Sequence, residues 1–203
     1  IEVLATRTQP KNTEASAITV ITQEEIREKN TFQVLELLKE QVGISGVQTG
    51  SFGSTASIFM RGANNDSTLV MIDGVQANST TLGQFNFADL NLDNVERIEI
   101  LRGPQSTLWG SDAVGGVINI ITKKGTGKAP EHFFGAEGGS FGTSKVRIGS
   151  GGDLGFLDYS VSSSRTDSEG FSTVNEIRGA TERDDYENTT VSTRICKNFL
   201  EDG

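Results

Sequence analysis

Residues 138–142 carry the only pattern in this sequence that could support nucleophilic catalysis. Gly138, Ser140 and Gly142 match G-x-S-x-G, the nucleophile elbow in which a serine is exposed on a strand-to-helix turn. Such a serine needs an acid and then a histidine later in the chain. The one histidine, His132, precedes Ser140, and strand-like sequence flanks the motif. We therefore expect no enzyme and interpret His132 as a surface residue or as an aromatic residue at the rim of a barrel. Phosphate-loop and H-E-x-x-H zinc patterns are absent as well.

A second group of reactive side chains is the acidic segment at residues 165–188. It holds seven carboxylates against three arginines. Clustered carboxylates with intervening carbonyl oxygens are the ligands that Ca²⁺ prefers. The candidate calcium ligands are Glu182, Asp184 and Asp185. The alternative is an acidic, solvated loop without a metal.

Two further segments have the composition of a small-molecule site. Residues 49–55 and 77–87 combine hydroxyl and amide groups with aromatic rings, which suits a large amphipathic ligand. The candidate contacts are Ser51, Phe52, Ser54, Asn78, Ser79, Phe85 and Asn86. The alternative is a pair of ordinary solvated loops whose aromatic rings are anchored in the core.

Charge and composition exclude several classes of protein. The formal net charge of −9 argues against nucleic acid as a partner. A single cysteine, Cys196, excludes an internal disulfide and a cysteine-based zinc cluster. The sequence contains no apolar run of about 18 residues, so no transmembrane helix is predicted. A strand of a membrane barrel, however, needs only about 10 alternating residues. The 24 glycines among 203 residues favour turns and tightly packed β structure.

The first of the elements that must position these groups is a β-prone segment, residues 1–6, followed by a polar linker. Such a segment suits pairing with a partner strand; the alternative is a frayed terminus or an edge strand of the domain. A strand is predicted over residues 17–21, and Thr22 with Glu25 forms a capping box that starts a helix.

The first helix should break near residues 30–31, which could cap a second helix. Val34, Leu35, Leu38 and Val42 recur at helical spacing and predict its core face. Gly43 is expected to end that helix.

Two hairpin-like patterns follow. Asp73 and Gly74 directly after an apolar run predict a type I′ turn. Residues 95–123 read as strand, connector, strand, with Glu96, Arg97 and Glu99 on the polar side of the first strand. The glycines of the connector permit positive φ angles and close backbone approach, and no ordinary helix is expected there.

The pattern changes after residue 126. Four segments between residues 134 and 195 alternate apolar with polar or charged residues, as outer-membrane strands do, although a soluble antiparallel sheet has the same period. A short turn is predicted at residues 149–155 and a long loop at 165–188. Short connectors on one side and long ones on the other are the outer-membrane arrangement.

The connector in residues 95–123 also resembles a known family. Its residues follow the order Arg102-Gly103-Pro104, Ser106, Trp109-Gly110-Ser111, Ala113 and Gly115-Gly116-Val117-Ile118-Asn119-Ile120. This order is similar to the plug signature of TonB-dependent outer-membrane receptors. Segments ending at Gly62 and Gly74 resemble further family elements, which extends the resemblance over residues 1–126.

The resemblance implies an α+β plug domain, a small mixed sheet with short helices, followed by antiparallel transmembrane β-barrel strands. The implied divisions are a tether at 1–8, the plug at 9–126 and about four barrel strands at 127–203. Four strands cannot close a barrel, and open edges in a bilayer leave backbone groups unpaired. The barrel is therefore incomplete in this chain, and we expect the N-terminal part of a longer receptor.

Roles for individual residues also follow from the resemblance. The tether would be the Ton box that pairs with periplasmic TonB: Ile1, Glu2, Val3, Leu4, Ala5 and Thr6. The residues that hold the plug together and against the barrel wall would be Arg61, Asp73, Gly74, Arg102, Gly103, Gly110, Gly115 and Gly116. Expected partners are TonB, a small-molecule ligand and outer-membrane lipid, with the receptor a monomer in the outer membrane of a Gram-negative bacterium.

The choice of ligand depends on finer likenesses. Loop lengths and residues 110–122 are most similar to cobalamin receptors, with ferric siderophore receptors as the alternative. The family's cobalamin transporter orders external loops with calcium through an Asp-x-Asp-Gly element; here Glu182 and Asp184 stand in its place without the glycine. An alternative of another class is a free-standing, plug-like binding module without transport.

Overall fold

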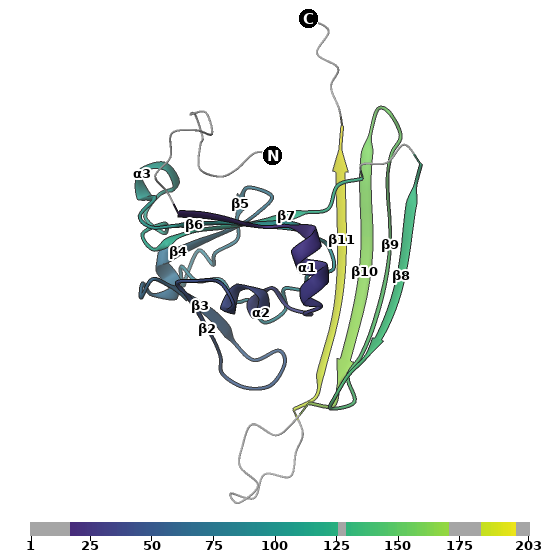
Figure 1. Ribbon diagram of the computed structural model, residues 1–203, viewed down its shortest axis with the longest axis horizontal. Helices are drawn as coiled ribbons and strands as arrows, with labels where there is room; N and C mark the ends of the chain where they lie inside the picture. The colour runs from purple at the N-terminus through teal and green to yellow at the C-terminus, as the bar shows by residue number, and fades with distance from the viewer. Residues whose placement is uncertain (1–16, 126–128, 171–183, 198–203) are drawn as a thin grey trace, which may run out of the picture. The chain divides into compact units, whose positions relative to one another are not determined.

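The computed structural model describes residues 17–125, 129–170 and 184–197 (Figure 1). These residues belong to two compact units. The first comprises residues 17–49 and 55–122, and the second comprises residues 50–54, 123–125, 129–170 and 184–197. No helix in the described ranges is long and apolar enough to cross a membrane. Each unit is presented on its own.

The first unit is built on a five-stranded mixed sheet. Its strand order is β1 (Ala17–Ile21), β6 (Val95–Arg102), β7 (Gly116–Thr122), β4 (Thr68–Ile72) and β5 (Val75–Gln76). β4 and β7 are parallel and the other neighbours are antiparallel. The mixed sheet expected for a plug is confirmed, and β7, in which residues 116–120 are all buried, lies at its centre, as a strand buried on both faces should.

One face of this sheet is covered by two short helices and a hairpin, as Figure 1 shows. The helices are α1 (Gln23–Lys29) and α2 (Val34–Lys39), and the hairpin pairs β2 (Ile44–Gln48) with β3 (Ala56–Met60). A single turn of 3₁₀ helix, η1 (Asn65–Ser67), precedes β4. Apolar side chains of all these elements except η1 join those of the sheet in one buried cluster, which includes Leu35, Leu38, Ile58, Ile100 and Ile118. Burial of this cluster is the main force that holds the layers together.

The helix boundaries were predicted only in part. Thr22 and Glu25 form the expected capping box, and Asn30 ends α1 in a left-handed conformation. The predicted second helix was too long, because α2 ends at Lys39 and Val42 is 87% exposed. Its N-cap is Gln33, not residues 30–31. A turn in which the Ile44 amide donates to the Gln41 carbonyl redirects the chain into β2 before another helical turn can form.

The opposite face of the sheet is covered by the connector between β6 and β7. Ala113 and Trp109 pack there on Leu69, Leu101 and Val117. The connector contains one short helical turn, α3 (Ser106–Trp109), which the sequence did not predict. A polar residue that is buried on this face must therefore find a partner inside the protein.

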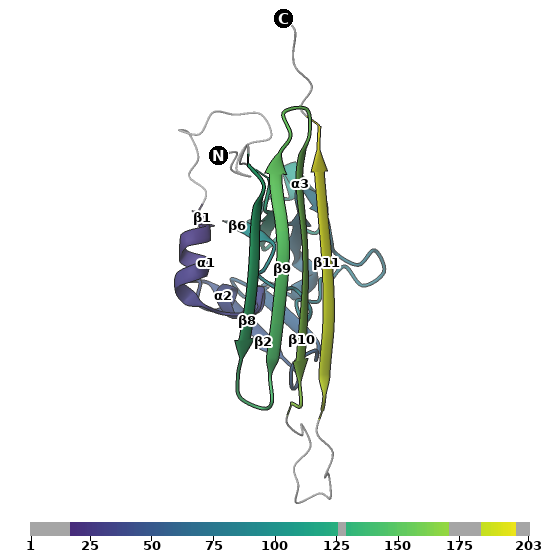
Figure 2. The ribbon, with the colours of Figure 1, turned by 90° about the vertical axis from the view of Figure 1, so that its right-hand side faces the viewer.

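The second unit contains an antiparallel meander of four long strands, seen face-on in Figure 2. They are β8 (Glu131–Gly138), β9 (Ser144–Asp153), β10 (Asp158–Ser168) and β11 (Tyr186–Cys196), paired in the order β11-β10-β9-β8. The predicted antiparallel strands are confirmed. In the part of the chain that the structure describes, the outer edges of β8 and β11 lack a strand partner and the sheet is not closed.

Two predicted connectors were wrong in extent. Residues 149–153 continue β9, and the turn lies at residues 154–157, where the Leu154 amide donates to the Leu157 carbonyl. The glycines of this segment suggested a turn. Gly149 instead lies inside the strand, where the absence of a side chain leaves room for the Phe133 ring. The long connector is also shorter than predicted, since residues 165–168 pair with 186–189.

Candidate functional site

The glycine-rich connector between β6 and β7 closes on itself and on the sheet. The Gly103 amide donates to the Gly115 carbonyl over 3.0 Å, and the Gln105 amide donates to the Ala113 carbonyl over 2.8 Å. Gly116 has φ +153°, and a Cβ there would lie 2.4 Å from the Leu101 carbonyl oxygen. Only glycine fits this position without displacing β6.

Two arginines converge next to this connector. The Arg102 guanidinium donates to the Thr19 hydroxyl over 2.6 Å, and its Nε is buried without a hydrogen-bond partner among the described residues. Burial lowers the pKa of Arg102, and the like charge of Arg61 lowers it further. A Cβ on Gly43 would touch both side chains. Two neighbouring cations with one unsatisfied donor favour an anion beside them.

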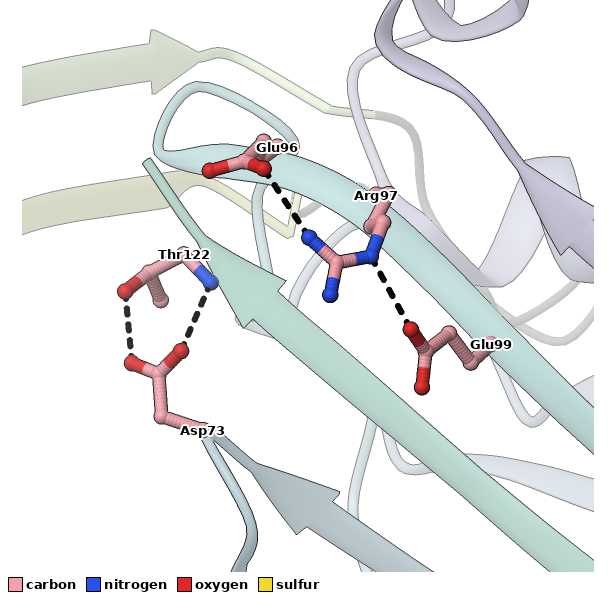
Figure 3. A network of polar contacts seen from close by, with 5 residues as sticks. All are labelled: Asp73, Glu96, Arg97, Glu99 and Thr122. Carbon is pink, nitrogen blue, oxygen red and sulfur yellow. Dashed lines mark hydrogen bonds and ion pairs between the residues drawn. The ribbon is translucent and has the colours of Figure 1, made fainter. Parts of the chain in front are cut away.

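Asp73 fastens the end of β7 to β4 (Figure 3). Its carboxylate accepts from the Thr122 amide over 2.9 Å and from the Thr122 hydroxyl over 2.6 Å. Asp73 and Gly74 both have positive φ, as a type I′ turn requires. The Gly74 amide donates to the Asn119 side chain over 3.2 Å. The role of this turn is structural, because the Asp73 carboxylate accepts from Thr122 of β7 and the Gly74 amide donates to Asn119 of the same strand.

A charged group that the sequence placed wrongly lies on β6, also in Figure 3. The Glu99 side chain is 2% exposed and accepts from Arg97 Nε over 2.9 Å, while Arg97 also donates to Glu96 over 2.9 Å. Strand alternation predicted a solvated Glu99. In the folded chain the carboxylate is buried instead. The spacing of Arg97 and Glu99, two residues apart on one strand face, is the signal that could have predicted the pair.

The predicted ligand residues of the loop at 77–87 separate into structural and accessible positions. The buried Asn78 accepts from the Val70 amide and donates to the Thr68 and Gly83 carbonyls. Asn86 is exposed, but its Oδ1 accepts from the Ala56 and Ala88 amides. Both amides thus hold the loop in its conformation. Ser79 is exposed and accepts from the Leu82 amide.

Aromatic rings of the predicted ligand loops also have structural contacts. Phe85 stacks edge-to-face on Phe87 with centroids 4.7 Å apart, beside the main buried cluster. In the second unit, Phe52 is 36% exposed with its ring centroid 6.0 Å from that of Tyr186. Ser51 is buried and Ser54 is half-buried. Phe52 and Ser79 are therefore the more accessible of the predicted contacts, and a ligand at these positions stays a prediction.

The remaining candidate residues, for TonB binding, calcium binding and nucleophilic catalysis, do not form a site within the described ranges. Residues 1–6 and Glu182 lie outside the described residues. Asp184 and Asp185 are exposed, and the described ranges hold no cluster of three potential metal-ligating side chains. Ser140 lies in the turn between β8 and β9, where its carbonyl accepts from the Thr143 amide. A strand–turn–strand is not the setting of a nucleophile elbow.

The sheet of the second unit has one apolar and one polar face. Side chains alternate between a face with Phe134, Ile148 and Val191 and a face with Glu137 and Arg147, which form an ion pair of 3.0 Å. The apolar face is highly exposed, with Phe134 at 74% and Val191 at 68%. Exposed apolar side chains in adjacent strands mark a face that is covered by something other than water.

Comparison with known proteins identifies what this chain is similar to. A family model described as TonB-dependent Receptor Plug Domain matches residues 10–117. The Vitamin B12 transporter BtuB of Photobacterium profundum is 36% identical over 169 residues, which cover 83% of this chain and 28% of that protein. BtuB of Vibrio vulnificus is 40% identical over 114 residues, covering 56% of this chain and 19% of that protein. The chain thus spans less than a third of the length of these curated relatives.

Solved structures agree in fold. The siderophore receptor PirA from Acinetobacter baumannii matches with a TM-score of 0.68 at 25% identity, over 91% of this chain and 29% of that one. The ferric yersiniabactin uptake receptor FyuA from Yersinia pestis matches with a TM-score of 0.69 at 22% identity, over 89% and 28%. Both matches extend over most of the chain.

Proposed function

This chain belongs to the TonB-dependent receptor plug domain family, and from that premise we propose that it forms the N-terminal part of an outer-membrane active transporter for a scarce, bulky nutrient. The observation that carries the proposal is the union in one chain of a plug sheet and a meander with one apolar face. An apolar face alternating with a polar one is what a strand needs between lipid and a polar lumen.

Cobalamin is the favoured nutrient. The curated relatives with 36% and 40% identity are named vitamin B12 transporters, whereas the siderophore receptors match at 25% identity or below. The structural matches keep a ferric siderophore as the second candidate. In either case the energy would come through TonB, which pairs with a strand formed by residues 1–6, and no catalytic residue is required.

The two converging arginines have a role in this proposal. Arg61 and Arg102 would bind carboxylates of the barrel wall and so keep the plug in place until force is applied. The buried, unpartnered Nε of Arg102 supports this role, because a desolvated cation is stabilised by a nearby anion. The pKa of Arg102, lowered by burial, would return toward its usual range when that anion is present.

Equilibrium binding to the purified full-length receptor that contains this chain tests the choice of nutrient. We expect saturable binding of cyanocobalamin and no competition by ferric enterobactin. Phe52→Ala should weaken cyanocobalamin binding about tenfold, or about 1.4 kcal/mol. Phe156→Ala is the matched control, because Phe156 is an exposed phenylalanine in the turn between β9 and β10, outside the predicted loops. Competition by ferric enterobactin would favour the siderophore alternative, and an equal effect of both variants would remove Phe52 from the site.

A further inference from the structure

The sheet of the second unit carries a hollow of about 510 Å³, within the range of about 300–1,000 Å³ common for ligand pockets. Its lining spans three adjacent strands, β8, β9 and β10. The lining residues are His132, Phe133, Phe134, Ile148, Gly149, Ser150, Val161, Ser162 and Ser163.

Strand register assigns the hollow to the apolar face. Phe134, Ile148 and Ser163 stand side by side in one row, and His132, Ser150 and Val161 stand in the next row on the same face. The row between them, Phe133 with Gly149 and Ser162, points to the other face and contributes the floor through its backbone. The hollow forms because the small Ser150 and Ser163 lie between larger apolar side chains.

The chemistry of the hollow suits hydrocarbon. Phe134, Ile148 and Val161 are 74%, 58% and 42% exposed, so their apolar atoms are available to an occupant. The lining contains no carboxylate, ammonium or guanidinium group. The Ser150 hydroxyl lies 3.4 Å from the Tyr159 hydroxyl and can satisfy its hydrogen bond without the occupant.

The same face becomes charged toward the end of the sheet where β10 stops and β11 begins. Arg165 lies one row beyond Ser163, and Asp167 and Glu187 form the following row. Arg165 contacts Asp167 over 3.0 Å and Glu187 over 2.9 Å. A face that is apolar around the hollow and charged in the next two rows matches the change from acyl chains to headgroups at a membrane boundary.

We propose that this hollow binds one acyl chain of a membrane phospholipid, with Arg165 and the following row of Asp167 and Glu187 at headgroup level. The proposal rests on the proposed function, because it requires the meander to lie in a bilayer. It goes further because it assigns one lipid to a defined binding site, called the lipid seat below, whereas a barrel surface in general makes only exchangeable contacts with lipid. Ser163 is the position that determines whether the chain fits, since a large side chain there would fill the hollow.

The orientation of the face is tested first, with nitroxide spin labels in the full-length receptor reconstituted in phosphatidylcholine vesicles. The labels are attached to Phe134→Cys and, as the matched control, Phe133→Cys, after the native cysteines have been replaced by serine. We expect the label at 134 to collide with dissolved oxygen far more than with a water-soluble nickel chelate, and the label at 133 to show a lower ratio. Equal ratios, or the reverse order, would overturn the proposal.

The seat itself is tested by native mass spectrometry of the receptor released from detergent, counting bound phosphatidylglycerol. We expect Ser163→Phe to lower lipid occupancy about tenfold, which corresponds to about 1.4 kcal/mol. Thr189→Phe is the matched control, because Thr189 shares this face next to Arg165 and outside the hollow. Ser150→Leu is a second filling variant in case the first does not assemble.

Each outcome decides the proposal. Loss of the adduct in Ser163→Phe or Ser150→Leu but not in Thr189→Phe supports a lipid seat. Unchanged occupancy in the filling variants, or dimers of the receptor in place of lipid adducts, contradicts it. Cyanocobalamin binding measured on the same samples separates this result from the proposed function, since a receptor without a lipid seat would still bind its nutrient.

Discussion

At the scale of single residues, Glu99 and Arg97 have the largest expected effect on stability. Their ion pair is buried on the carboxylate side, with Glu99 only 2% exposed. A buried pair gains little over an apolar pair, but the loss of one partner leaves an uncompensated charge that costs about 3–5 kcal/mol. Arg97→Met takes the guanidinium away from the buried Glu99 carboxylate and should therefore accelerate hydrogen exchange of the β6 amides by about a hundredfold or more.

A double variant is the control for this pair. Arg97→Met with Glu99→Leu replaces both charges by apolar groups of similar size and should restore most of the protection in β6. Exchange is measured by mass spectrometry of the intact receptor. If the double variant is no more protected than Arg97→Met alone, packing and not charge explains the effect.

Asp73 has a smaller and more local role. Asp73→Ala removes the two acceptors of the Thr122 amide and hydroxyl, which should cost about 1–3 kcal/mol. We expect faster exchange at the C-terminal end of β7. Asp66→Ala is the control, because the Asp66 carboxylate accepts from the neighbouring Ser67 hydroxyl and does not join two strands. The same response in both variants would show that Asp73 is not the clamp.

At the scale of elements, the connector between β6 and β7 depends on close backbone approach at Gly116. Gly110→Ala should cost only backbone strain, since φ is +92° and a Cβ there meets nothing within 4 Å. Gly116→Ala adds a collision with Met60 and with the Leu101 carbonyl. We therefore expect Gly116→Ala to lower the protection of β6 and β7 well beyond Gly110→Ala. Equal effects would mean that the collision is relieved by movement.

Strand positions were predictable because their apolar patterns are long and the two-residue period is clear. β1, β4, β6 and β7 appear where expected, and the capping box of α1 is local enough to be predicted. The end of α2 was not, since Val42 keeps helical spacing but the chain turns first. The burial of Glu99 depends on the tertiary fold around the sheet, which no local pattern specifies.

The candidate ligand loops show the same limit. Composition selected Asn78 and Asn86 as polar groups for a ligand, but their side chains bind the backbone of their own unit. Amides suit both purposes equally well. Burial separates Asn78 from the exposed Phe52 and Ser79. Asn86 is exposed as well, and only its hydrogen bonds from two backbone amides identify it as structural.

At the scale of the whole molecule, the tether is the element that would connect the plug to its energy source. Deletion of residues 1–6 from the full-length receptor should abolish nutrient uptake and leave cyanocobalamin affinity unchanged, because strand pairing with TonB is distinct from ligand contact. Uptake by whole cells and binding to isolated membranes are measured in parallel. Uptake that survives the deletion would place the TonB contact elsewhere.

The most direct test of the central claim is uptake of radiolabelled cyanocobalamin by cells that lack their own cobalamin receptor and express the full-length receptor containing this chain. The strains differ only in the presence of TonB. We predict accumulation above the receptor-free background when TonB is present, and none when it is absent. Accumulation that is independent of TonB, or its absence in cells that do take up ferric enterobactin through this receptor, would contradict the assignment of a TonB-driven cobalamin transporter.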